Sequence, residues 1–230
     1  MNDMTYEELK SIKSNIITFI SKLNEISIEF NQELNQSEKA FFIFISKHII
    51  LFKYLYEGMG KMYFFKVIIS DLYYYILSII KNETRYIYLN ERSIIENYTR
   101  AVVRKTVEED HVTENLFTKI KNMEFSFDFK EEDYALIKSE YVTSCGFVHG
   151  SSILEGDLAF ILDECLENSK FIKDINKYYE RIRKIFKTYD KMLISQYGDI
   201  ISSCFHRQKT IFEYLLGEEC LDLLLKVTTK

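Results

Sequence analysis

The residues best suited to chemistry in this chain are a single histidine and a run of charged side chains far from it in sequence. His149 stands in the segment YVTSCGFVHG, between Gly146 and Gly150, although the chain has only seven glycines in 230 residues. Histidine titrates near neutral pH and can move protons, and the glycines give the backbone freedom for close approach of a ligand. Ser151 and Ser152 follow, and their hydroxyl groups and backbone N–H groups could bind a substrate. The segment predicts a proton-transfer site at the end of a helix, although a structural, hydrogen-bonded histidine is the alternative.

The second candidate group is an acid between two arginines. Arg92, Glu96 and Arg100 are spaced four residues apart, which on a helix places all three on one face. Arginine is scarce here, with seven copies against 23 lysines, and its guanidinium binds phosphate in a bidentate manner. We therefore predict that Arg92 and Arg100 act on a phosphate beside His149 and that Glu96 takes part in substrate binding. A solvated row of ion pairs is the alternative interpretation.

Composition narrows the classes of protein that fit. The net charge of −5 argues against a broadly basic nucleic-acid binder, so contact with a polyanion must be local. The four cysteines form no C-x-x-C pair, which argues against a zinc ribbon, and we expect no metal and no cofactor. The N-terminus lacks a signal-peptide pattern. Charged residues interrupt both apolar stretches, 40–56 and 62–80, so we expect core helices, no membrane contact and a cytoplasmic protein.

The elements that must position these residues are helices. Proline is absent, which favours long helices, although translation of AT-rich DNA would give the same bias. Apolar residues recur at helical spacing along most of the chain, so we predict one all-α domain over 1–230, a bundle of seven to nine helices. The expected helices cover about 7–34, 38–57, 62–81, 91–107, 114–123, 130–145, 157–168, 171–197 and 200–226.

Three local details accompany this prediction. Ser37 and Asn90 are expected to cap the helices that follow them. The segment 124–130 alternates apolar and polar residues like a strand, but a lone strand cannot bury itself. We therefore expect an extended linker there that packs its phenylalanines.

The two candidate groups together resemble HEPN-type all-α proteins of bacterial defence and toxin–antitoxin loci. The resemblance lies in a helix reading R-S-x-x-E-x-x-x-R, followed some fifty residues later by Y-x-x-x-C-x-x-V-H-G. It covers about 62–168, with the helical pair 171–226 outside it. It implies a dimeric helical bundle with a metal-independent RNA-cleaving site at the dimer seam, where histidine handles protons and arginine stabilises the charged phosphorane.

The chain departs from the HEPN hallmark, which is an arginine separated from the histidine by four to six intervening residues. Val142, Thr143 and Ser144 occupy those positions ahead of His149, so Arg92 or Arg100 would have to supply the cation. Arg104 and His111 match the spacing literally, but the residues between them are partly acidic and would repel RNA.

Two functions follow from these observations. The first is a HEPN-like toxin or defence ribonuclease that acts on RNA as a homodimer. The second is a non-catalytic helical subunit that binds a protein partner from the same locus, which the missing arginine and the negative charge favour. A helical DNA-binding regulator fits less well because no basic recognition helix is present.

Overall fold

The computed structural model describes residues 3–30, 32–103, 114–149, 157, 159, 172 and 174–229, and these residues form helices and no strand. The predicted all-α class is confirmed. The helices of this described part are α1 (Asp3–Glu29), α2 (Gln36–Gly58), α3 (Tyr63–Ile80), α4 (Thr84–Val103), α5 (Glu114–Asn122), α6 (Glu131–His149), α8 (Ile175–Cys204), α9 (Lys209–Leu216) and α10 (Glu218–Thr228).

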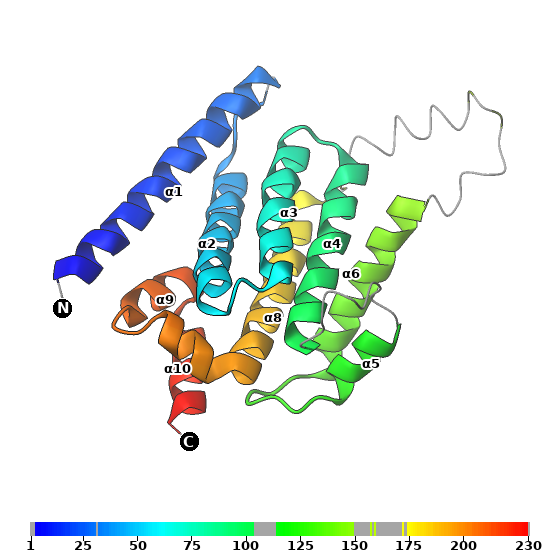
Figure 1. The fold of residues 1–230 in the computed structure, drawn as a ribbon. Helices are drawn as coiled ribbons and strands as arrows, with labels where there is room; N and C mark the ends of the chain where they lie inside the picture. The colour runs from blue at the N-terminus through cyan, green and yellow to red at the C-terminus, as the bar shows by residue number, and fades with distance from the viewer. Residues whose placement is uncertain are drawn as a thin grey trace.

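The helices α2, α3, α4 and α8 form the centre of the bundle, with α6 alongside α4 and α1 on the opposite side (Figure 1). One contiguous apolar cluster draws side chains from all of these helices and from α5, α9 and α10. Of the described helices, α3 has the length and apolar character to cross a membrane, yet half of that 18-residue window is buried inside the protein. It packs between α2 and α4, so both predicted core helices lie where the sequence analysis places them.

The start of α2 is fixed by Asn35. Its side chain accepts a hydrogen bond from the backbone of Glu38, and the Glu38 carboxylate accepts one from the Asn35 backbone at 2.8 Å. This reciprocal pair satisfies two N–H groups that the first helical turn leaves open. The prediction of Ser37 as the cap is therefore wrong by two residues. The Ser37 hydroxyl instead contacts Asn176 at the start of α8.

The start of α4 differs from its predicted position by seven residues. The helix begins at Thr84, after a tight turn in which Asn82 has a φ of 56°. Asn90, expected as the cap, lies inside the helix, where its side-chain amide donates to the Tyr86 carbonyl at 2.7 Å. This local bond satisfies Asn90 without ending the helix. The earlier start adds almost two turns, which place Arg85 on the same helix as Arg92.

The segment 123–130 is neither helix nor strand, and it bends at Ser126 and Phe127 instead of running straight as an extended linker would. The rings of Phe125, Phe127 and Phe129 pack against one another with centroids 5.4–6.1 Å apart. The backbone N–H of Ser126 donates to the Ser195 hydroxyl of α8 at 2.7 Å. The segment is thus attached to α8 and forms one wall of a cleft described below.

The C-terminal part divides differently from the predicted helical pair. The helix α8 continues to Cys204 through a kink at Tyr197, whose φ of −129° is not helical. The predicted helix 200–226 is interrupted twice, by a turn in which Arg207 has a φ of 61° and at Gly217, with a φ of 90°. Glycine adopts such a φ without strain, so it separates α9 from α10. The predicted short helix 157–168 lies outside the described residues, apart from positions 157 and 159.

Candidate functional site at the seam of α4 and α6

The predicted charged stripe lies on α4 where this helix meets α6. The Arg92 Nε donates to the Glu96 Oε1 at 3.0 Å, and the Tyr141 hydroxyl of α6 donates to the same oxygen at 3.0 Å. The Arg92 guanidinium carbon lies 5.9 Å from the centre of the Tyr141 ring. Arg100, one turn further along, donates from Nη1 to the Asn97 side chain at 3.4 Å. One carboxylate oxygen of Glu96 therefore accepts hydrogen bonds from both Arg92 and Tyr141 and fixes the positions of these side chains.

A second polar row on α4 faces α3. The Ser93 hydroxyl donates to Asp71 of α3 at 2.7 Å, and the Asn97 amide donates to the Ser93 carbonyl at 2.8 Å. Burial and repulsion by Glu96 raise the pKa of Asp71 to about 6, although the bond from Ser93 opposes the shift. Asp71, between α3 and α4, thus has a pKa well above that of an ordinary aspartate.

The register between α4 and α6 decides which residues lie near His149. Arg85 donates from Nη2 to the Val148 carbonyl at 3.4 Å. The Tyr88 and Phe147 rings stack with centroids 4.0 Å apart, and Ser144 contacts Glu91. Tyr141 contacts Glu96. As the residue number on α4 increases from 85 to 96, the number of its partner on α6 therefore decreases from 148 to 141. The two helices are antiparallel, and α6 ends at His149 beside Arg85.

This register gives unequal positions to the two predicted arginines. With a rise of about 1.5 Å per residue, Arg92 lies about 10 Å and Arg100 about 22 Å along the α4 axis from Arg85. Within one chain, Arg85 is therefore nearer than either predicted arginine to the backbone of His149. The signal for Arg85 was present in the sequence, because positions 85, 89, 92 and 96 fall on one helical face. The late predicted start of α4 concealed it.

Several predicted features fall at or beyond the end of this seam. The helix α6 passes through Gly146, so this glycine lies within the helix instead of marking its end. The His149 side chain, Ser151, Ser152 and the alternative pair Arg104 and His111 lie outside the described residues. Their proposed roles stay predictions.

A buried acid lies beneath the seam, and the sequence analysis missed it. Glu91 is 2% exposed, and the hydroxyls of Ser144 and Tyr178 each lie 2.5 Å from its carboxyl oxygens. Burial, with repulsion by Glu140, raises the pKa of Glu91 to about 8. Glu140 is paired with Arg181 of α8 at 3.0 and 3.3 Å. Glu91 is thus mainly protonated at neutral pH, and its hydrogen bonds join α4 to α6 and α8.

A similar polar contact lies deeper in the bundle. His48 is 1% exposed, and its Nε2 lies 2.9 Å from the Asp190 Oδ2, while its Nδ1 lies 2.9 Å from the Phe44 carbonyl. The Tyr98 hydroxyl donates to the other Asp190 oxygen at 3.1 Å. Because both nitrogens of the buried His48 ring have partners, we assign this pair to packing of α2 against α8. Among the residues that the structure describes, no group of His, Cys, Asp and Glu side chains could hold a metal ion.

No protein-family model, no curated protein and no solved structure matches this chain. The resemblance to HEPN proteins therefore stays a prediction, which depends on the sequence pattern.

Proposed function

We propose that this protein is a HEPN-like, metal-independent ribonuclease of a bacterial defence or toxin system, with its site at the seam of α4 and α6. The observation that carries the proposal is the antiparallel register, which ends α6 at His149 beside Arg85, with Arg92 two turns further along α4. Two guanidinium groups on the face that leads to a histidine suit a phosphodiester substrate. A cytoplasmic location and a homodimer belong to the same proposal.

The proposed reaction needs only a base, an acid and a cation. His149 accepts the proton of an RNA 2′-hydroxyl, and the 2′-oxygen attacks the adjacent phosphorus. Arginine stabilises the negative charge of the phosphorane. The bond to the 5′-oxygen then breaks, and this oxygen takes the proton back from the His149 imidazolium, which yields a 2′,3′-cyclic phosphate, a 5′-hydroxyl and neutral His149. Arg100 lies too far along α4 to act on the same phosphate as Arg85 within one chain. Its predicted role in catalysis therefore requires a second copy of the chain that brings its own Arg100 to this phosphate.

One observation favours the second candidate function, a non-catalytic subunit that binds a partner from the same locus. Arg92 is engaged by Glu96 and lies against Tyr141, and its side chain is only 25% exposed. An arginine held in this way contributes to a shaped polar surface without reaching a phosphate. The ribonuclease and the partner-binding subunit would use the same surface at the seam of α4 and α6. They differ in whether RNA is cleaved there.

A cleavage assay separates them. Purified full-length protein is incubated with a labelled RNA in EDTA, and the ends of the products are analysed. We expect cleavage with cyclic-phosphate ends, and a loss of at least about 100-fold in rate for His149→Ala, because proton transfer by a side chain contributes about that much or more. Arg85→Ala and Arg92→Ala should also slow the reaction, whereas Lys66→Ala, an exposed change on α3, should not. No cleavage, with a partner that co-purifies and is lost on Arg92→Ala, would support the subunit instead.

A further inference from the structure

A cleft of about 310 Å³ lies at the far end of α6 from His149, between α8, the segment 123–130 and the first turn of α6. The ion pair of Lys184 with Asp133, at 3.1 Å, joins α8 to the start of α6 there. Asp133 is 16 residues from His149, or about 24 Å along the helix. The cleft is therefore separate from the seam proposed above.

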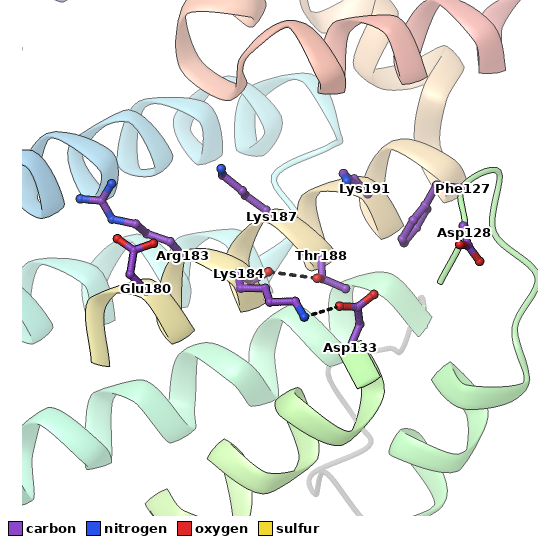
Figure 2. Close-up of a pocket in the computed structure, with 9 residues that line it drawn as sticks. All are labelled: Phe127, Asp128, Asp133, Glu180, Arg183, Lys184, Lys187, Thr188 and Lys191. Carbon is purple, nitrogen blue, oxygen red and sulfur yellow. Dashed lines mark hydrogen bonds and ion pairs between the residues drawn. The ribbon is translucent and has the colours of Figure 1, made fainter. Parts of the chain in front are cut away.

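Three cations of α8 line this cleft at a regular interval. Arg183, Lys187 and Lys191 are spaced four residues apart, which gives a rise of about 6 Å between neighbours on one helical face. Figure 2 shows Arg183 and Lys187 extending to the same side of α8, with Lys191 further along the helix, whereas Lys184 turns the other way to reach Asp133. The cleft is also lined by Asp128, Asp133 and Glu180, so its four cations exceed its three carboxylates by one, and the positive charge is concentrated on the Arg183, Lys187 and Lys191 face of α8.

The partners of these cations leave them available to an anion. The guanidinium of Arg183 lies over the rings of Phe44 and Phe41, 5.5 and 5.8 Å from their centres, and its Nε is buried with no hydrogen-bond partner among the described residues. No carboxylate among the described residues forms an ion pair with this guanidinium. Lys187 is exposed, and no described acid lies within ion-pair distance of it.

Lys191 marks the other end of the row. It pairs with Glu219 at 2.5 Å, but the Glu219 side chain is 74% exposed and can release it to a competing anion. The Lys191 Nζ also lies 5.9 Å from the centre of the Phe127 ring. An aromatic ring beside a row of cations can stack a base, as in proteins that bind single-stranded nucleic acid.

We propose that this cleft of α8 binds the phosphate backbone of a single-stranded RNA, with Phe127 stacking against one base. A regular row suits a polymer of phosphates better than one isolated phosphate, and the ring favours RNA over an acidic peptide. The choice of RNA over DNA rests on the proposed function, but the binding site does not require that the seam be catalytic.

The test measures binding without cleavage. Full-length protein carrying His149→Ala is titrated in EDTA against a fluorescently labelled oligouridylate, by anisotropy at several salt concentrations. Three phosphate contacts predict a slope of log K against log salt of about −2, and Lys187→Ala should reduce its magnitude by about 0.7. Arg183→Ala, Lys187→Ala and Lys191→Ala combined should abolish the salt-dependent binding. Lys66→Ala removes an equal charge from an exposed position of α3 and should leave the slope unchanged.

A gain of affinity provides a second test. Glu219→Gln removes the acid that pairs with Lys191 and should tighten RNA binding. An unchanged slope in Lys187→Ala and in the triple variant, or equal binding of a polyglutamate peptide, would overturn the proposal. If the wild type does not cleave RNA but binding follows these variants, the ribonuclease proposal fails and the RNA-binding cleft stands. If the wild type cleaves RNA but the α8 variants do not change RNA binding, the ribonuclease proposal stands and the RNA-binding cleft fails.

Discussion

The buried acid Glu91 gives the sharpest prediction about stability. In the unfolded chain a glutamate loses its proton near pH 4.5, whereas in the folded protein the pKa of Glu91 is about 8. Between these values the folded state binds more protons, so this group lowers stability as the pH rises from about 4.5 to about 8. Below and above that window its contribution is constant. Glu91→Gln replaces it with a neutral side chain of similar shape and removes the dependence.

The expected magnitude follows from the same shift. A difference of one pKa unit corresponds to about 1.4 kcal/mol, so a change from 4.5 to about 8 corresponds to about 5 kcal/mol across the window. Any hydrogen bond lost or gained by the amide changes the free energy of unfolding of the Glu91→Gln variant by the same amount at every pH. The quantity of interest is therefore the stability of the variant minus that of the wild type, plotted against pH.

Urea unfolding of both proteins from about pH 5 to about pH 9 measures this difference. It should rise steadily in favour of Glu91→Gln up to about pH 8 and then level off. The Tyr178 hydroxyl stabilises the ionised form of Glu91, so Tyr178→Phe should raise the pKa of Glu91 further. In that background the stability difference between Glu91→Gln and Glu91 should keep rising to a higher pH. A difference that varies by less than about 1 kcal/mol over the range would refute the assignment of Glu91 as a neutral acid.

Three further changes test the packing of the bundle. Asn35→Ala removes the cap of α2 and should cost about 1 kcal/mol in urea unfolding, with no change in m-value. Asp190→Ala leaves the buried ring of His48 without its carboxylate and should cost about 3–5 kcal/mol, measured in the same way; a loss below about 1 kcal/mol would show that the pair contributes little. A Cβ at Gly58 would lie 2.1 Å from the Cys204 Sγ, so Gly58→Ala should cost about 1–3 kcal/mol, and adding Cys204→Ala should recover most of the loss; no recovery would contradict the clash.

The helical fold could be predicted because the pattern is local. Apolar residues at helical spacing identify α2 and α3 as core helices, and the phenylalanines of 123–130 could be recognised as packing residues without a strand partner. The boundary errors are also local. Asn90 has the right residue type for a cap, but a bond to the preceding turn satisfies its side chain equally well.

The site was harder to predict because its contacts join distant parts of the chain. Glu91 resembles an ordinary surface glutamate of α4 until Ser144 and Tyr178, 53 and 87 residues away, enclose it. The spacing of Arg183, Lys187 and Lys191 is visible in the sequence, but packing of α8 decides whether that face meets solvent. The predicted stripe of Arg92 and Glu96 does share one face with Arg100, but the register with α6 places Arg100 far from the end of α6 at His149.

RNA cleavage in EDTA by the wild type and by His149→Ala decides whether the seam of α4 and α6 is a ribonuclease site. We expect metal-independent products that end in 2′,3′-cyclic phosphate for the wild type and almost none for the variant. Equal cleavage by both proteins, or none by either at high protein concentration, would contradict it.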